Sequence, residues 1–425
     1  MSSTGRMDAP ALGLGSRGRA GGFSDWLVGA AARRRRLTET FVQTFEVWGY
    51  GYIATPLVEP LATVAAGVGP ARQAQLFRFM DADGDMLALV GERTVSVARV
   101  VATQLQRGPF PLRLGYAGPV LRNQALHGGR RRESLQAGCE LIGHSGLAAD
   151  AECIALAATA LDKAGMRDVQ VDVGHADFVP GLLDSAGVDA HLQRDVLGAL
   201  ERRDLVAVET ALQATEMAEA ERRLLLAFPA LRGGREILDT AMQDVRGERP
   251  RRALQDLAAL WDLLDAHGIT DRVHLDLGAV RDWDYYTGPT FEVFSEDSGF
   301  PLGSGGRYDG LLERFGLPEP ATGFVLHVDR CLDTLTRRTG DVLVVAPVQV
   351  TWAAGAHRAA LELARGLHVA GLACTCGLAP GSGLDGDRSV YVDTKRVRWT
   401  IDGRAGDGDR GAALAAVLQA LRPRR

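Results

Sequence analysis

An arginine, two adjacent tyrosines and a third tyrosine follow one another near the middle of the second half of the chain. Arg281 comes first, Tyr285 and Tyr286 follow on a predicted strand, and Tyr308 ends the glycine-rich stretch 303–308, G-S-G-G-R-Y. An arginine fork can hold a carboxylate, phenol hydroxyls can donate or accept hydrogen bonds, and glycines let the backbone approach a bound molecule closely. Core packing is the default for any one tyrosine. The residues together indicate a binding site.

A second group of polar residues lies on the predicted strand 132–141. Alternation along a strand places Ser134, Gln136 and Glu140 on one face, whereas the opposite face is apolar. The polar face either faces solvent or forms the floor of a site, and the strand alone does not separate the two. The nearby Arg122 favours a site, because arginine forks suit phosphates and carboxylates.

The surrounding elements predict an antiparallel sheet with helices packed against it. Apolar residues recur at three- and four-residue spacing over 24–48, which is typical of an amphipathic helix. Residues 76–89 predict a β-hairpin around a D-A-D-G turn, and a helix is expected over 94–105. Segments 112–122 and 132–143 predict an antiparallel strand pair. Hairpins and helices in this order indicate an α+β fold.

Helical periodicity then dominates residues 178–262, which we interpret as an insertion within the sheet domain. Strands are predicted between 273 and 294, a helix over 309–315 and a linker near 336–341.

A small C-terminal α/β unit is expected beyond this linker. Its predicted elements are a buried strand over 341–347, a helix over 356–369 and a strand over 372–376. The expected domains are therefore a disordered tail (1–20), a core (21–335) and a reduced C-terminal domain (341–425).

The composition is that of a globular protein, which we expect in the cytoplasm. The chain has 425 residues, 46% hydrophobic, and a formal net charge of -5, so it lacks the basic field typical of nucleic-acid-binding proteins. Its five cysteines show no paired C-x-x-C spacing, so neither a disulfide framework nor a metal site is predicted. No apolar signal sequence is found, and no segment reaches the ~20 apolar residues that a membrane helix needs.

Three stretches, taken in order, resemble the sequence motifs of class II aminoacyl-tRNA synthetases in their histidyl form. Residues 51–59 (G-Y-I-A-T-P-L-V-E) are similar to motif 1, residues 118–143 to motif 2, and residues 322–330 (T-G-F-V-L-H-V-D-R) to motif 3. The tyrosine and G-G-R-Y-D-G stretches match the histidine signature between motifs 2 and 3. The resemblance covers about 22–332 and implies a class II synthetase-like antiparallel sheet flanked by helices.

Carried over position by position, the resemblance implies a histidine-binding pocket. Glu92 and Thr94 match residues that hold the α-amino group with help from Gln136. Arg281 matches the residue that faces the carboxylate. Residues matching those around the imidazole are Glu140, Tyr286 and Tyr308, and Arg122 and Tyr285 complete the expected pocket.

The resemblance also implies that the adjoining nucleotide site is degraded. Gln124 replaces the glutamate of Arg-x-Glu in the enzymes' motif 2, and His327 stands where motif 3 leaves room for adenine. Amino-acid activation needs ATP held against fixed cations. The positions that match this site are Gln124, Arg130, His327 and Arg330.

Details of motifs 2 and 3 are more similar to a non-catalytic branch, the regulatory subunits of ATP phosphoribosyltransferase. That likeness implies a protein with no catalysis or cofactor of its own that binds histidine and controls the first step of histidine biosynthesis. Its implied partner is a short-form ATP phosphoribosyltransferase catalytic subunit, joined by a dimer of this chain in a hetero-oligomer, without tRNA or membrane. Two alternatives stay open: a histidyl-tRNA synthetase with a divergent ATP site, and a histidine-sensing paralogue with another partner.

Overall fold

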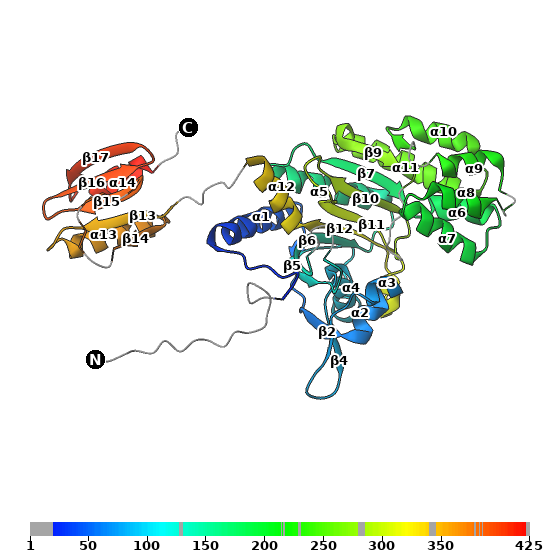
Figure 1. Cartoon of the computed structure of the whole chain (residues 1–425), viewed down its shortest axis with the longest axis horizontal. Coiled ribbons are helices and arrows are strands. Elements are labelled where there is room, and N and C mark those ends of the chain that lie inside the picture. Colours follow the sequence, from blue (N-terminus) through cyan, green and yellow to red (C-terminus); the bar gives the residue numbers. More distant parts are fainter. Residues whose placement is uncertain are drawn as a thin grey trace, which may run out of the picture. The chain divides into compact units, whose positions relative to one another are not determined.

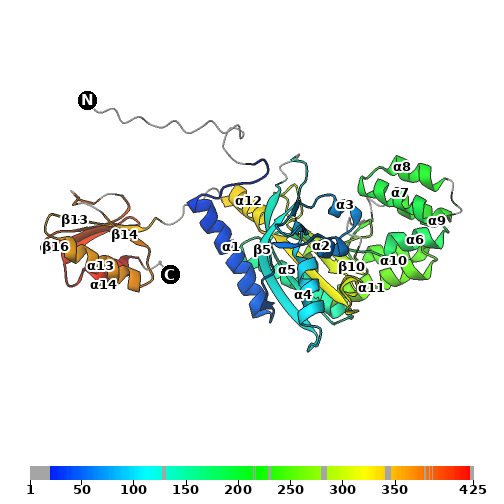
Figure 2. The same cartoon turned by 90° about the horizontal axis from the view of Figure 1, so that it is seen from below.

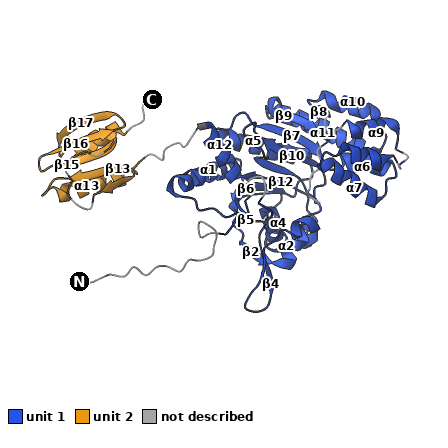
Figure 3. Ribbon diagram, in the orientation of Figure 1, with its two compact units in different colours: residues 1–340 blue, residues 341–425 orange. Residues whose placement is uncertain are grey.

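The computed structural model divides the chain into two compact units, residues 1–340 and 341–425 (Figure 3). The described residues are 20–126, 131–213, 215, 217–227, 231–278, 285–339, 346–377, 380–381, 383–384 and 386–421. Each unit has its own sheet and its own apolar core. The tail expected at 1–20 lies, apart from residue 20, outside the described residues.

A nine-stranded sheet forms the centre of the first unit (Figure 1). Its strands in spatial order are β1 (Gly51–Tyr52), β5 (Leu112–Leu121), β6 (Glu133–Ile142), β12 (Ala321–His327), β11 (Gly303–Arg307), β10 (Pro289–Phe294), β7 (Gln170–His175), β9 (Val273–Asp276) and β8 (Arg232–Gly233). Neighbours are antiparallel except for two parallel pairs, β1 with β5 and β7 with β9. The predicted pair at 112–122 and 132–143 is confirmed as β5 and β6, and the predicted α+β class is confirmed.

Three helices pack as a layer on this sheet. They are α1 (Val28–Val47), α5 (Leu147–Lys163) and α12 (Val328–Thr339). Alternate residues of β6, Ala137, Cys139 and Leu141, join the same buried core as Phe41 and Phe45 of α1. Removing this apolar surface from water stabilises the layer. The alternation along β6 leaves its polar side chains on the opposite face.

A smaller three-stranded sheet and further helices complete the region around that polar face. The elements are β2 (Val58–Pro60), α2 (Leu61–Gly67), α3 (Pro70–Gln73), β3 (Arg78–Met80), β4 (Met86–Leu89), α4 (Arg93–Gln104) and the 3-10 helix η4 (Leu312–Phe315). β4 lies between β2 and β3, and α4 packs against β6. The predicted hairpin at 76–89 and the predicted helix at 94–105 are confirmed.

Six helices gather at the end of the sheet that carries β7, β8 and β9 (Figures 1 and 2). They are α6 (Phe178–Ser185), α7 (Ala190–Glu201), α8 (Leu205–Leu212), α9 (Glu219–Leu226), α10 (Glu236–Asp244) and α11 (Glu248–Ala266), and the 3-10 helix η3 (Thr270–Arg272) follows. Helix α11 connects this group to the sheet by packing against α5, β7 and β10.

The second unit is a five-stranded sheet with two helices. Its elements are β13 (Val348–Trp352), α13 (His357–Val369), β14 (Cys374–Cys376), β15 (Arg388–Val392), β16 (Arg396–Ile401), β17 (Arg404–Asp409) and α14 (Ala413–Ala420). The buried strand expected at 341–347 lies largely outside the described residues, and the strand after it, β13, was not predicted.

Several expected boundaries were wrong. The first helix begins at Val28 instead of residue 24, and α12 continues to Thr339 through most of the expected linker. Residues 309–315 form only the short 3-10 helix η4. No helix in the described part of the chain is long and apolar enough to cross a membrane.

Candidate ligand-binding site

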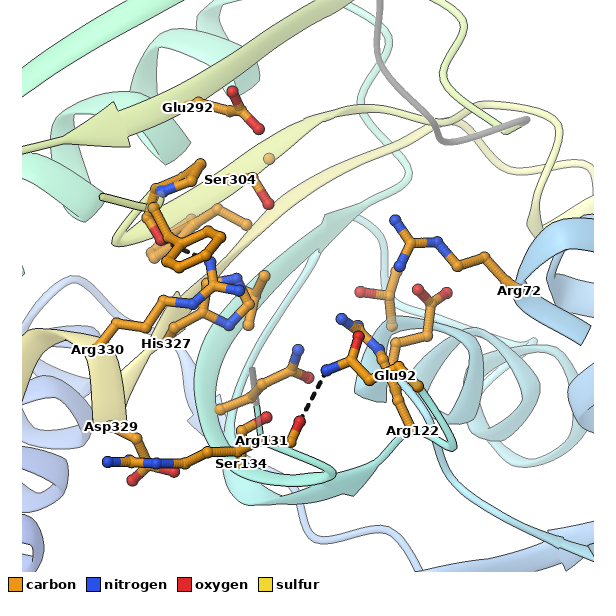
Figure 4. A pocket seen from close by; sticks show the side chains of 18 of the residues that line it. Arg72, Glu92, Arg122, Arg131, Ser134, Glu292, Ser304, His327, Asp329 and Arg330 are labelled. Atoms are coloured by element: carbon orange, nitrogen blue, oxygen red, sulfur yellow. Dashed lines mark hydrogen bonds between the residues drawn. The ribbon is translucent and has the colours of Figure 1, made fainter. Parts of the chain in front are cut away.

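A cavity of about 630 Å³ lies over the polar face of β6 (Figure 4). Its wall comes from segments far apart in the sequence: the region of α3 and α4, the loop before β6, the strands β10 to β12, and α12. The predicted site residues that line it are Glu92, Thr94, Arg122, Gln124, Gln136, Tyr285, Tyr286, Tyr308, His327 and Arg330. The fold therefore brings together residues from separate parts of the sequence, among them the stretches that resemble motifs 2 and 3 and the histidine signature.

Glu92 stands immediately before helix α4 and is 6% exposed. Within the described part of the chain, its Oε1 atom has no hydrogen-bond partner. Burial raises the pKa of the Glu92 carboxyl to about 7, against the opposing charges of Arg122 and Arg72 and a hydrogen bond from Tyr285. A buried carboxylate with spare acceptor capacity is a natural partner for a ligand ammonium group.

Glu140 lies behind the cavity wall instead of on it. Its Oε1 accepts a hydrogen bond from the Tyr116 hydroxyl at 3.1 Å, and its Oε2 accepts one from Tyr308. Burial raises the pKa of Glu140 to about 8, while hydrogen bonds from Tyr308, Thr94 and Tyr116 oppose the rise. Thr94, predicted to hold an amino group, therefore also contacts the Glu140 cluster.

The three tyrosines of the histidine signature pack edge to face. The ring centroid of Tyr285 lies 5.1 Å from that of Tyr286 and 5.8 Å from that of Tyr308. The prediction that Tyr285 and Tyr286 lie on a strand was wrong, because both precede β10 (Pro289–Phe294). Their hydroxyls can therefore be presented from a turn instead of a pleated surface.

The glycines of β11 allow this strand to pack closely against β12. A Cβ atom on Gly303 would lie 2.8 Å from the carbonyl oxygen of Val325, and one on Gly305 would lie 2.4 Å from that of Gly323. Both distances are impossible for real Cβ atoms, so any larger residue would push β11 away from β12. Gly305 also lines the cavity, so the expectation that these glycines let the backbone approach a bound molecule stays a prediction.

Arg307 fixes the end of β11 next to Tyr308. Its Nη2 donates to Asp150 Oδ2 at 2.6 Å and to the Gly146 carbonyl at 3.1 Å, and its Nη1 donates to Asp309 at 3.2 Å. Arg307 and Asp150 are both buried. Arg307 lies within the stretch G-S-G-G-R-Y, but its sequence context did not predict this structural role.

The far end of the cavity contains His327 and Arg330 (Figure 4). Burial, with the charges of Arg330, Arg122 and Arg72, lowers the pKa of His327 well below its ordinary value, so the imidazole is neutral at pH 7. Arg330 donates through Nη1 to the Pro301 carbonyl at 2.7 Å.

Polar side chains near this end of the cavity form hydrogen bonds with neighbouring side chains and with the backbone. The Gln124 side-chain amide donates to the Arg131 carbonyl at 2.7 Å. Asp329 accepts from Arg34 Nε at 2.6 Å and from the Leu135 N–H at 3.0 Å. Arg34 is one of four consecutive arginines in α1, residues 33–36, and its role in the structure is that of an internal ion-pair partner.

Two predicted site residues, Arg130 and Arg281, lie outside the described residues. The cavity wall also contains polar residues that were not predicted from the sequence, among them Arg72, Glu292 and Ser304. Glu292 and Ser304 lie in stretches that the sequence already singled out, whereas Arg72 lies outside every motif, and the fold brings all three to the same wall.

The sheet, the acidic residue before α4 and the tyrosine-lined cavity define a class II synthetase-like protein of the histidyl type. A profile of the histidyl-tRNA synthetase family matches residues 22–331. A solved histidyl-tRNA synthetase from Nostoc has the same fold, with a TM-score of 0.79 at 18% identity, covering 95% of this chain and 99% of its own.

Closer sequence relatives carry a different name. The ATP phosphoribosyltransferase regulatory subunits of Geobacter sulfurreducens and Bacillus subtilis are 39% and 38% identical to this chain, covering 76% and 74% of it and 76% and 80% of their own lengths. A Bacillus halodurans structure described as an ATP phosphoribosyltransferase regulatory subunit/histidyl-tRNA synthetase has a TM-score of 0.78 at 30% identity, covering 88% of this chain and 96% of its own. The chain belongs to the family of ATP phosphoribosyltransferase regulatory subunits.

Proposed function

We propose that this chain is a regulatory subunit without catalysis of its own, which binds free histidine in the cavity. Its occupancy would control a separate, short-form ATP phosphoribosyltransferase chain and thereby the first step of histidine biosynthesis. The names of the relatives support the regulatory role. The buried Glu92 carboxylate, facing a cavity that leads to the Glu140 cluster, carries the proposal for the ligand.

Histidine offers a cationic amino group at one end and an imidazole at the other. In the proposed pose, Glu92 accepts from the amino group with help from Gln136, and the imidazole lies toward Tyr308 and Glu140. Because its raised pKa lies near neutrality, Glu140 can act as an acceptor or, once protonated, as a donor to the cluster around it. A ring that both donates and accepts hydrogen bonds matches such a cluster.

The nucleotide end of the cavity supports the absence of amino-acid activation. His327 lines the cavity where the synthetases' motif 3 leaves room for adenine, although the guanidinium groups of Arg122 and Arg330 line the same cavity. The Asp329 carboxylate accepts a hydrogen bond from Arg34, and the Gln124 side-chain amide donates one to the Arg131 carbonyl. The volume of about 630 Å³ nevertheless exceeds what one small amino acid fills, so the distinction needs a chemical test.

That test is histidine-dependent exchange of pyrophosphate into ATP by the purified chain, with calorimetric titration of histidine alongside it. We expect histidine to bind and no exchange above the level without histidine. Robust exchange would establish the alternative, a histidyl-tRNA synthetase. Histidine binding without a response from an ATP phosphoribosyltransferase would favour a sensor with another partner.

We further propose that the protein works in the cytoplasm as a dimer within a hetero-oligomer, without tRNA or a cofactor. The net charge of -5 supports the absence of tRNA binding. Mass measurement of the complex purified from co-expressed chains tests the assembly.

A further inference from the structure

A row of three polar side chains crosses the sheet behind the cavity. Its members are Tyr116 of β5, Glu140 of β6 and Tyr308 directly after β11, and all three are buried. The Tyr116 hydroxyl donates to Glu140 Oε1 at 3.1 Å, and the Tyr308 hydroxyl donates to Glu140 Oε2. Of these three described residues only Tyr308 lines the cavity, so a ligand would meet the row at this one end.

Two glycines give these side chains room to lean across the sheet. Tyr116 is the register partner of Gly138, and a Cβ atom on Gly138 would lie 2.7 Å from the Tyr116 hydroxyl oxygen. Glu140 is the register partner of Gly323 on β12, and a Cβ atom there would collide with Glu140 Oε2. The phenol therefore lies over one glycine and the carboxylate over the other.

The row connects Tyr116 to a side chain of the cavity wall that it does not itself form. Whether Glu140 is ionised or protonated, each of its oxygens can form a hydrogen bond with one tyrosine. A buried oxygen that has lost its partner costs free energy, so without the Tyr116 hydroxyl the carboxyl would gain by turning toward other donors. The Tyr308 hydroxyl would then lose its fixed position, and a ligand would have to order it on binding.

We infer that Tyr116 is a positioning residue of the ligand site, which acts through Glu140 to fix the Tyr308 hydroxyl against which the ligand ring lies. This inference rests on the proposed function and adds a residue to it. The family resemblance places Glu140 and Tyr308 around the imidazole and gives Tyr116 no role. Tyr116 matters for binding without touching the ligand.

The test measures the dissociation constant of histidine by calorimetry for wild type, Tyr116→Phe, Tyr308→Phe and the double variant. We expect Tyr116→Phe to weaken histidine binding about three- to tenfold, the cost of ordering one side chain on binding. Tyr308→Phe should weaken binding at least as much. Adding Tyr116→Phe to Tyr308→Phe should weaken it no further, because the two residues act through one connection.

Tyr50→Phe is the matched control. The Tyr50 hydroxyl also donates to a glutamate, Glu152 Oε1, at 3.0 Å, and Tyr50 is also buried, but it packs in the core with α1 and α5 on the other face of the sheet. Losing the same kind of bond there should leave histidine affinity at the wild-type value. Equal weakening by Tyr50→Phe and Tyr116→Phe would reduce Tyr116 to a general structural role.

Two further results would overturn the role of Tyr116 while leaving the proposed function in place. They are unchanged histidine binding in Tyr116→Phe, and equal weakening by this change in the wild-type and Tyr308→Phe backgrounds. If the wild-type chain bound no histidine, the proposed function would itself fail.

A second measurement covers the case in which Tyr116→Phe does not fold. A 3-fluorotyrosine placed at position 116 keeps both the ring and its hydroxyl. Its fluorine NMR signal should shift when histidine binds, because the row connects this position to the cavity wall. An unshifted signal at saturating histidine would contradict that connection.

Discussion

At the scale of single residues, the protonation of Glu92 should govern ligand binding. An ammonium ligand prefers the ionised carboxylate, and the pKa of Glu92 is raised to about 7 in the empty site. Between pH 6 and pH 8, histidine affinity should therefore rise with pH, by at most about tenfold per pH unit below pH 7. Calorimetry in buffers of different ionisation enthalpy should also detect a proton released by the protein.

Glu92→Gln removes this titration with little change in shape. We expect it to weaken histidine binding by ~1.5–3 kcal/mol, roughly 10- to 150-fold, the value of a hydrogen bond to a charged group. The remaining pH dependence should be that of histidine itself. Glu39→Gln, an exposed change on α1, serves as the control, and an unchanged pH profile in Glu92→Gln would refute the assignment.

Ionisation of Glu92 should favour ligand binding but destabilise the folded chain. Because its pKa is higher in the folded chain than in the unfolded one, its contribution to stability is present below the unfolded value of 4.5 and is lost as pH rises through about 7. Glu140, with a folded pKa of about 8, acts in the same direction. Empty protein should therefore gain stability from Glu92→Gln at pH 8, measurable by urea denaturation.

The sequence predicted which residues line the site better than what each contacts. Gln136 and Tyr308 could be assigned because they lie in recognisable motifs, and Glu92 because its position matches a residue of the resembling family. Asp329 could not, because its partner Arg34 lies 295 residues away in the chain. Arg72 escaped notice for a related reason, since a four-residue helix carries no periodic signal.

At the scale of elements, the buried pair of Arg307 and Asp150 joins β11 to α5. Removing one member of a buried ion pair leaves the other charge without compensation and typically costs ~3–5 kcal/mol. Arg307→Met should therefore lower the free energy of unfolding by that amount in urea. The matched change Arg35→Met breaks the exposed pair with Glu39 and should cost at most ~1 kcal/mol. A comparable loss in both variants would contradict this account of Arg307.

The narrow contact between β11 and β12 makes a second prediction at this scale. Gly305→Ala places a methyl group 2.4 Å from the Gly323 carbonyl oxygen and 2.6 Å from the Phe291 ring. Overpacking of this kind costs ~1–3 kcal/mol, so the melting temperature should fall by several degrees. The control is Gly310→Ala, where an added methyl group meets nothing within 4 Å, and it should melt at the wild-type temperature. If Gly305→Ala also melted at the wild-type temperature, β11 would be able to shift away from β12 at little cost.

Elements with clear local sequence signals were predicted, whereas a strand whose own residues disfavour strand structure was not. The hairpin of β3 and β4 and helix α4 show clear turn and periodicity signals. Strand β17 (Arg404–Asp409), reading R-A-G-D-G-D, contains residues that disfavour strands, and it exists through its antiparallel pairing with β16. Local propensity cannot reveal such a strand, because its partner supplies the stabilisation.

At the scale of the whole molecule, the proposed function places ligand binding and catalysis on different chains. In the proposed function, the synthetase-like unit binds the amino acid, and the reaction that it controls belongs to another chain. Such regulation requires histidine to bind two arrangements of the assembly unequally, with a coupling free energy of typically ~1–3 kcal/mol.

The most direct measurement is the histidine concentration that halves phosphoribosyl transfer by the reconstituted complex, compared between wild type and Glu92→Gln. We expect both complexes to be active without histidine, and the variant to need at least tenfold more histidine for half inhibition. Equal inhibition of both complexes at the same histidine concentration would place the histidine sensor elsewhere and contradict the central claim.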